Sequence, residues 1–180
     1  MEFLNREAEV YVPDGQSAGL AIARTTHLAV GAHPDDIPVM ALDGILRCFG
    51  RDDRWFLGVT VTDGASSPRS GPYGRFSDAE MRDVRTAEEK KAAAVGEYGA
   101  AVMLGHSSAV VKDPTVTAVV DELSTLIELA GPSVVYTHNL ADKHDTHVGV
   151  ALRTIDALRR LPPVSRPEVV YGCEVWRGLD

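Results

Sequence analysis

Short apolar runs alternate along the chain with stretches in which apolar residues recur every three or four positions. The first pattern is typical of strands buried on both faces, and the second of helices with one buried face. The apolar runs predict strands at residues 27–32, 55–62, 100–105, 133–137 and 168–176. The helical spacing predicts helices at residues 38–49, 77–98, 113–129 and 145–160.

This order of elements predicts an α/β fold, a single domain with a mostly parallel sheet and helices on both faces, because each strand–helix–strand crossover lays a helix on the sheet. Residues 1–25 have a mixed pattern with a turn at Pro13-Asp14-Gly15, so we expect an N-terminal arm before a domain at 26–180. Residues 64–76 are rich in Gly, Pro and Ser and predict a long functional loop. Ser77 and Glu80 after it match a capping box.

Composition narrows the class of protein. The chain has 180 residues, of which 44% are hydrophobic and 24% charged, as in a globular domain. Its net charge of -8 and lack of a basic cluster argue against a nucleic-acid partner. No apolar run is long enough for a membrane span, the N-terminus lacks a signal-peptide layout, and Cys48 and Cys173 resemble buried thiols. We therefore expect a cytoplasmic protein with no membrane partner.

Two polar segments at the ends of predicted strands carry the candidate chemistry. Residues 31–36 read Gly-Ala-His-Pro-Asp-Asp, and residues 137–147 contain three histidines. In an open α/β sheet the carboxyl ends of the strands form the site, so we expect the segments to meet. Catalytic zinc takes three His or Asp ligands and keeps one position for water. We therefore predict a zinc site held by His33, Asp36 and His147.

Neighbouring residues supply the other groups that hydrolysis needs. Asp35 is the candidate general base, because a carboxylate beside the metal can take a proton from the activated water. His144, three residues before His147, is the candidate for stabilising an oxyanion or protonating a leaving amine. Asp145 would orient that imidazole and raise its pKa. The structural alternative is that Asp35-Asp36 caps a helix and His33-Pro34 forms a turn, but the joint occurrence of both segments favours a site.

The two segments resemble the signatures of one family. Residues 32–36, Ala-His-Pro-Asp-Asp, resemble the first motif of the LmbE-like, or PIG-L, family of zinc-dependent de-N-acetylases. Residues 144–147, His-Asp-Thr-His, resemble its second motif, usually His-Pro-Asp-His. The resemblance covers roughly residues 26–176 and implies a Rossmann-like sheet. It also implies the roles reached above: His33, Asp36 and His147 as ligands, Asp35 as base, and His144 with Asp145 at the tetrahedral intermediate.

The resemblance further implies a substrate-binding arginine in the helix after the long loop. Arg85 is the best match and Arg82 the second, although a surface ion pair with Glu88 or Glu89 explains Arg85 equally well. His138, at the end of the fourth strand, is a further substrate-binding candidate, with hydrogen-bonded packing as its alternative. The implied substrate is a small-molecule N-acetyl amino sugar, such as an N-acetylglucosamine conjugate.

The sequence also departs from the family pattern. Ile37 and Pro38 follow the aspartate pair where Glu is common, and Thr146 differs within the second motif, so the contacts behind the ligands and the choice of substrate are expected to differ. Family members commonly continue past Trp176-Arg177, so we expect a fragment, a C-terminally truncated chain or a minimal member of the family. Its exposed apolar surface would call for a partner chain, such as a second copy in a homo-oligomer.

Three hypotheses follow. The leading one is a zinc-dependent amidase that deacetylates amino sugars, with another divalent ion as the alternative metal. The second is a catalytically inactive metal- or ligand-binding protein on the same scaffold. The third is a receiver-like phosphoacceptor domain, suggested by Asp35-Asp36 after the first strand, with Lys143 as a loose match for the lysine that such domains need.

Overall fold

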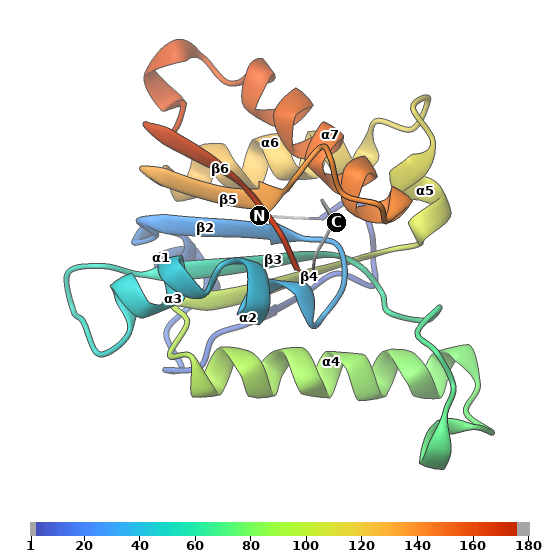
Figure 1. Cartoon of the computed structure of the whole chain (residues 1–180). Helices are drawn as coiled ribbons and strands as arrows, with labels where there is room; N and C mark the ends of the chain where they lie inside the picture. The colour runs from blue at the N-terminus through green and yellow to red at the C-terminus, as the bar shows by residue number, and fades with distance from the viewer. Residues whose placement is uncertain (1–2, 176–180) are drawn as a thin grey trace.

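The structure, a computed structural model, describes residues 3–175 and is built on a six-stranded sheet in the order β1-β4-β3-β2-β5-β6. The strands are β1 (Glu9–Tyr11), β2 (His27–Gly31), β3 (Phe56–Thr62), β4 (Ala100–His106), β5 (Val134–His138) and β6 (Val169–Cys173). β1 runs antiparallel to β4, and the other neighbouring strands pair in parallel. The predicted α/β fold with a mostly parallel sheet is therefore confirmed (Figure 1).

Helices cover both faces of this sheet. The helices are α1 (Ala18–Ala23), α2 (Asp36–Met40), α3 (Leu42–Cys48), α4 (Asp78–Val95), α5 (Ser108–Lys112), α6 (Ala118–Ala130) and α7 (Asp145–Arg160). Two short 3-10 turns, η1 (Gly71–Tyr73) and η2 (Pro163–Ser165), lie in connections. The α2, α3 and α4 helices contribute to one buried cluster, and α1, α5, α6 and α7 to the other.

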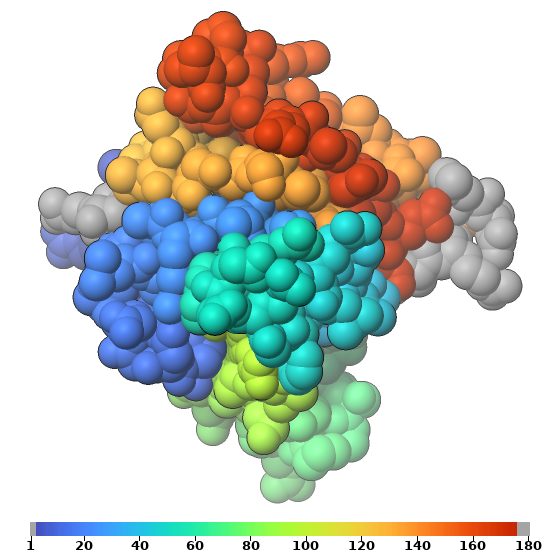
Figure 2. All heavy atoms as spheres, turned by 90° about the vertical axis from the view of Figure 1, so that its left-hand side faces the viewer, coloured from blue at the N-terminus to red at the C-terminus, as the bar shows by residue number. Residues whose placement is uncertain are grey.

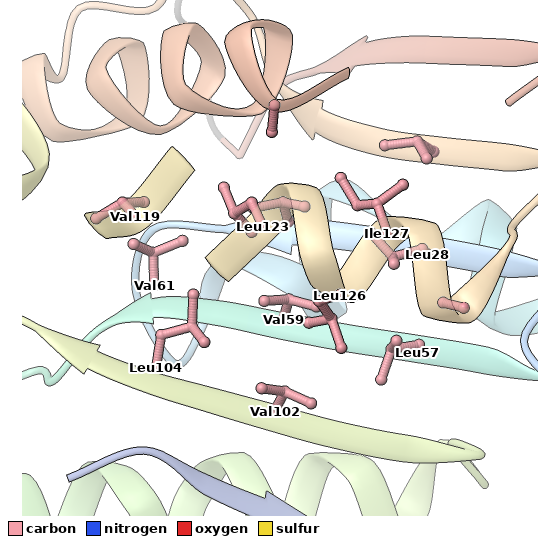
Figure 3. Close-up of a cluster of buried hydrophobic side chains, with 14 of the residues drawn as sticks. Leu28, Leu57, Val59, Val61, Val102, Leu104, Val119, Leu123, Leu126 and Ile127 are labelled. Atoms are coloured by element: carbon pink, nitrogen blue, oxygen red, sulfur yellow. The ribbon is translucent and has the colours of Figure 1, made fainter. Parts of the chain in front are cut away.

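Successive strand residues point to opposite faces and so feed the two clusters alternately. Leu28 and Val30 of β2 pack in the larger cluster beneath α6, whereas Ala29 between them packs against α2 and α3. Figure 3 shows the leucine and isoleucine side chains of α6 resting on β2, β3 and β4. Each such fully buried side chain contributes about 1.5–3 kcal/mol, which fixes the sheet that carries the site.

The predicted strands and the helix at residues 145–160 are confirmed to within a few residues, and Ser77 forms the predicted capping box with Glu80. The predicted helix at residues 113–129 begins later, at Ala118. Asp113 instead accepts hydrogen bonds from the backbone and hydroxyl of Thr115 and closes the short helix α5, which the sequence did not predict. The helix predicted at 38–49 is divided into α2 and α3 at Ala41, and Trp176 lies outside the described residues.

Residues 1–25, expected to be an arm, contribute strand β1 and helix α1 to the fold. Glu122 of α6 anchors this segment. Its Oε1 accepts hydrogen bonds from the backbone N–H groups of Leu4 and Asn5 at 2.7 and 3.0 Å. Its Oε2 lies 2.5 Å from Nε2 of His106, at the end of β4. The domain boundary predicted at residue 26 thus falls inside a continuous packing arrangement.

The sheet has a topological switch point between β2 and β5. After β2 the chain passes through α2 and α3 on one face, and after β5 it enters α7 on the other face. A crevice opens where the two connections diverge, and ligands bind in such crevices in α/β proteins. Gly31 ends β2, and a Cβ there would lie only 2.8 Å from Ile37 Cγ1, so glycine permits the close turn into α2.

The opposite end of the sheet is closed by other connections. Figure 2 shows the N-terminal segment and the α3–β3 connection gathered on the face where the strands begin. Here the Arg24 guanidinium lies 3.5 Å from the Trp55 ring centroid and contacts Asp14 Oδ2 at 2.5 Å. These contacts hold the connections together, whereas the candidate ligands all lie at the other end.

Some apolar surface stays exposed. Val170 and Tyr171 on the edge strand β6 are 45% and 47% exposed, and Leu42 and Leu46 of α3 are 51% and 62% exposed. These are surfaces on which a partner chain would pack, so the homo-oligomer remains a prediction. Within residues 3–175, no helix has the length and apolar character needed to cross a membrane.

We predict that Glu122→Ala destabilises the fold by about 3–5 kcal/mol, because it leaves His106 and two backbone donors buried without their acceptor. Burial raises the pKa of Glu122, but contacts with His106 and the backbone outweigh burial and hold this pKa below its usual value of 4.5. The difference in the free energy of unfolding between wild type and variant should therefore be largest above about pH 4.5 and should decrease as the pH falls below this value. Thermal unfolding across this range measures it, with exposed Glu128→Ala on the same helix as the control; equal loss in both variants would contradict the prediction.

Candidate metal centre and active-site cavity

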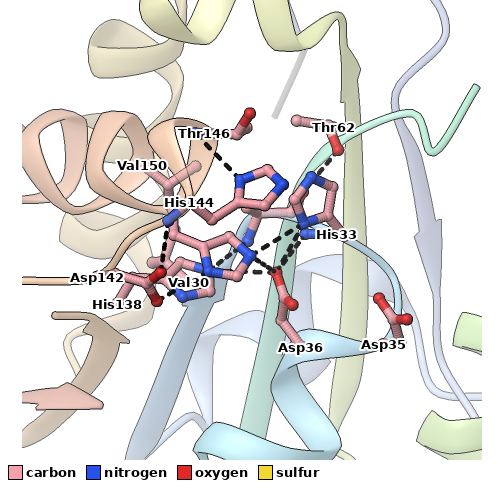
Figure 4. A network of polar contacts seen from close by, with 12 residues as sticks. Val30, His33, Asp35, Asp36, Thr62, His138, Asp142, His144, Thr146 and Val150 are labelled. Atoms are coloured by element: carbon pink, nitrogen blue, oxygen red, sulfur yellow. Dashed lines mark hydrogen bonds and ion pairs between the residues drawn. The ribbon is translucent and has the colours of Figure 1, made fainter. Parts of the chain in front are cut away.

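The three predicted ligands converge where β2 and β5 end (Figure 4). His33 Nδ1 lies 3.2 Å from both Asp36 Oδ2 and His147 Nε2, and the latter two atoms are 3.4 Å apart. Ligand atoms around tetrahedral zinc, with bonds of about 2.0–2.1 Å, stand about 3.3 Å from one another. The three atoms thus match one face of such a tetrahedron, with a fourth position left for water or substrate.

Local backbone geometry sets this convergence. The His33 N–H donates to Asp36 Oδ2 at 2.7 Å, and the Asp36 N–H donates back to the His33 carbonyl at 3.1 Å. This reciprocal turn brings the two side chains together across the spacing of three that the sequence displays. His147 comes from the first turn of α7, which is capped by His144.

Asp142 orients the His147 ring, and the sequence analysis did not nominate it. His147 Nδ1 lies 2.9 Å from Asp142 Oδ2, and both side chains are almost fully buried. Because Nδ1–H donates to this carboxylate, Nε2 keeps its lone pair toward His33 and Asp36, as in metal sites where a carboxylate supports a ligating histidine. The only sequence signal was an acidic residue in the loop, and no spacing rule links it to His147.

The electrostatics of the cluster also fit a cation. Burial alone would raise the pKa of Asp36, but its contacts with the His138, His147 and His33 rings hold that pKa well below its usual range. Burial lowers the pKa of His147, yet Asp36 and Asp142 outweigh it and raise the pKa overall. The carboxylates thus favour a positive charge between the candidate ligand atoms, and a divalent cation that bound there would compete with protons for the same nitrogens.

His138 lies behind the ligands. Its ring is 1% exposed, stacks on the His147 ring with centroids 4.0 Å apart, and accepts the Ala32 N–H at Nε2 over 2.8 Å. Asp36, His138 and His147 are also close enough together to share an ion, but the Ala32 N–H already uses the His138 lone pair. Among the described residues His138 is absent from the cavity wall, and its contacts are those expected of the packing alternative, so its substrate-binding role remains a prediction.

A cavity of about 690 Å³, a size suited to a small-molecule ligand, opens onto His33, Asp36 and His144. Asp35 is 70% exposed in its wall, set to one side of the cluster in Figure 4. Its Oδ1 lies 2.8 Å from Arg85 Nη2. The structure therefore brings Asp35 and His144 to the same cavity as His33 and Asp36, two of the candidate ligands.

Arg85 makes the ion pair with Glu88 that was weighed as its structural role, and its substrate-binding role remains a prediction. It lines the cavity, and its Nη1 contacts Glu88 Oε2 at 2.6 Å. Gly64 makes this arrangement possible: it has a φ of 70°, and a Cβ there would lie 2.8 Å from Arg85 Cβ. The long loop can therefore pass close to α4 only with glycine at this position.

Two predicted residues lie apart from the ligand cluster. Arg82 donates to Asp63 at 2.7 Å and lines a second cavity, of about 310 Å³. Asp145 Oδ2 lies 2.9 Å from Lys112 Nζ, and its Oδ1 is 3.8 Å from His144 Nδ1, too far for a hydrogen bond. His144 Nδ1 instead accepts the Thr146 N–H at 3.3 Å. Burial and then the His147 and His33 rings lower the pKa of His144, and they outweigh the increase that Asp145 contributes as expected.

The fold and the cluster define a class: a Rossmann-like α/β protein with His and Asp side chains arranged as a candidate metal centre at its switch point. The sequence model of the GlcNAc-PI de-N-acetylase family, PIG-L, matches residues 28–158, and the chain belongs to this family. No curated protein matches the chain.

Solved structures share the fold at low sequence identity. The conserved protein TT1542 from Thermus thermophilus has a TM-score of 0.65 at 18% identity, covering 83% of this chain and 66% of that one. The N,N'-diacetylchitobiose deacetylase from Pyrococcus horikoshii has a TM-score of 0.62 at 19% identity, with coverage of 78% and 52%. GalB, the 4-carboxy-2-hydroxymuconate hydratase from Pseudomonas putida, has a TM-score of 0.61 at 17% identity, with coverage of 82% and 62%. The chain thus spans between 52% and 66% of the length of these relatives.

We predict that Asp142→Asn weakens metal binding about 10–100-fold, because the His147 ring loses the carboxylate that sets its orientation and basicity. Zinc titration in competition with a chromophoric chelator measures the affinity. Asp35→Asn is the matched control, since Asp35 lies in the cavity wall outside the ligand triangle and should bind zinc as wild type does. Wild-type affinity in Asp142→Asn would contradict the assignment.

Proposed function

We propose that this chain is a metal-dependent hydrolase, with zinc as the metal, that removes the N-acetyl group from an amino sugar or amino-sugar conjugate. The observation that carries the proposal is the ligand triangle of His33, Asp36 and His147, which opens onto a cavity walled by Asp35 and His144. Family membership and the deacetylase among the structural relatives support the substrate class. The hydratase on the same fold is the reason that function must be argued from the site.

His33, Asp36 and His147 would hold the cation, which when bound supplies a Lewis acid and lowers the pKa of water. Asp35 takes a proton from the attacking water as it adds to the acetyl carbonyl. Arg85 holds the Asp35 carboxylate in place through its 2.8 Å ion pair. The carbon–nitrogen bond then breaks, and acetate and the free amine leave.

His144 serves as a neutral donor in this scheme. Because its Nδ1 accepts the Thr146 N–H, the ring proton is on Nε2, where it can donate to the developing oxyanion. Its lowered pKa disfavours the imidazolium form that would protonate the amine. Asp35 is therefore the better source of that proton, having received it from water.

The cytoplasmic location and the absence of nucleic-acid or membrane partners remain predictions.

We predict that Asp35→Asn lowers kcat by about 10²–10⁴-fold, the usual contribution of a general base, while zinc content stays at the wild-type value. Acetate release from an N-acetylglucosamine glycoside, together with elemental analysis, measures both quantities. Full activity in the variant would refute the base assignment. Zinc-loaded wild type that releases no acetate from any amino-sugar glycoside would favour the non-catalytic alternative.

We predict that Tyr73→Ala raises KM about fivefold to tenfold with little change in kcat. Tyr73 lines the cavity from the long loop, and its ring packs edge-on against Phe76 with centroids 5.4 Å apart. An aromatic face gives about 0.5–1.5 kcal/mol when an apolar surface, such as the C–H face of a pyranose, packs on it. Steady-state kinetics test this, and Tyr73→Phe should restore KM; a lower kcat at unchanged KM would contradict it.

A further inference from the structure

Among the described residues, carboxylates outnumber cations in the wall of the active-site cavity. The carboxylates are Asp35, Asp36, Asp63, Glu88 and Asp145, and the cations are Arg85 and Lys112. Histidines aside, five formal negative charges within residues 3–175 therefore face two positive charges. A divalent cation on the ligand cluster would offset two of the carboxylates, and the balance would still be negative.

Both of these cations already have carboxylate partners. Arg85 contacts Asp35 at 2.8 Å and Glu88 at 2.6 Å, and its side chain is 13% exposed. Lys112 contacts Asp145 at 2.9 Å across the rim between α5 and α7. A phosphate or carboxylate that approached either cation would also come within reach of these aspartates and glutamates, and the repulsion would offset the attraction.

The remaining polar groups in the wall are uncharged. The Ser66, Ser67 and Ser70 hydroxyls come from the long loop, and the Ser108 hydroxyl comes from the first turn of α5. Hydroxyl groups donate and accept hydrogen bonds without a net charge, which suits the hydroxyls of a sugar. The described part of the wall thus offers neutral recognition of a sugar, and it contains no cation that is unpaired and could receive an anionic substituent.

The negative field continues beyond this cavity. The second cavity shares Thr62 and Asp63 with the first. Its other carboxylates include Glu7, Glu9 and Asp83, while Arg82 supplies a cation already paired with Asp63. Lys90 contacts Glu9 at 2.5 Å. Together with the net charge of -8, this indicates that an anionic ligand meets repulsion on approach as well as in the cavity.

From these charges we infer that the enzyme selects N-acetyl amino sugars whose remaining substituents are neutral or cationic, and discriminates against conjugates with a phosphate or carboxylate next to the sugar. The inference rests on the proposed function, because it concerns the same cavity. It narrows the substrate to neutral oligosaccharides and to glycosides that carry a free amine.

Three N-acetylglucosamine glycosides of similar size test this on the zinc-loaded full chain: the aminoethyl, hydroxyethyl and carboxymethyl glycosides. Acetate release gives kcat/KM for each, and calorimetric titration gives binding to the same protein whether or not turnover occurs. We expect the carboxymethyl glycoside to be at least about fivefold poorer than the hydroxyethyl glycoside, and the aminoethyl glycoside to be equal or better. The difference should shrink between about 10 mM and about 500 mM salt.

A pair of charge variants locates the effect. Asp145→Asn removes one rim carboxylate and releases Lys112, so discrimination against the carboxymethyl glycoside should fall about threefold. Asp156→Asn makes the same change in charge on the same helix. Asp156 does not line the cavity and pairs with Arg159 over 3.6 Å, so this variant should leave the discrimination unchanged.

The outcomes separate the two proposals. A carboxymethyl glycoside that binds or reacts as well as the hydroxyethyl glycoside at low salt overturns the charge inference and leaves deacetylation standing. No acetate from any of the three overturns the proposed function, and the order of the three binding constants then still decides the inference. Equal effects of Asp145→Asn and Asp156→Asn would show that net charge, and not the cavity wall, sets the preference.

Discussion

The Oδ2 atom of Asp36 is the point on which the site depends. It accepts the His33 N–H and lies within 3.4 Å of ring nitrogens of His33, His138 and His147. A buried carboxylate is unfavourable unless charged or hydrogen-bonding partners surround it. Those partners come from the turn after β2, the end of β5 and the first turn of α7, so the one oxygen holds three separate segments in position.

The sheet makes this contact available. β2 and β5 are parallel neighbours, with Val30 opposite Thr137, so both strands end at the same level. Their connections then pass to opposite faces, α2 to one and α7 to the other, which opens the crevice. The core beneath α6 keeps the strands in register, and the buried Asp142–His147 contact sets the final ring orientation. The contacts that stabilise the sheet therefore also set the positions of the candidate ligand atoms.

The pairing of charges extends from the ligand cluster into the cavity. Among residues 3–175, Arg85 and Lys112 are the cations of its wall, and each pairs with carboxylates that also face the cavity. The Asp35–Arg85 pair keeps the proposed base oriented, while the serine hydroxyls of the long loop offer neutral hydrogen bonds. Under the proposed function, the same charge pairs that would orient the base beside a cation would also favour uncharged substrates.

The sequence determined the strands, most of the helices and the candidate ligands, because burial periodicity and the spacing of His33 and Asp36 are local properties. Long-range contacts decided the rest. Strand β1 forms only because β4 offers an edge, and α6 starts at Ala118 because Asp113 caps a turn. Asp142 contacts His147, His138 packs behind the His147 ring, and Asp145 pairs with Lys112. The sequence could not predict these contacts, because only the folded sheet brings the partners close together.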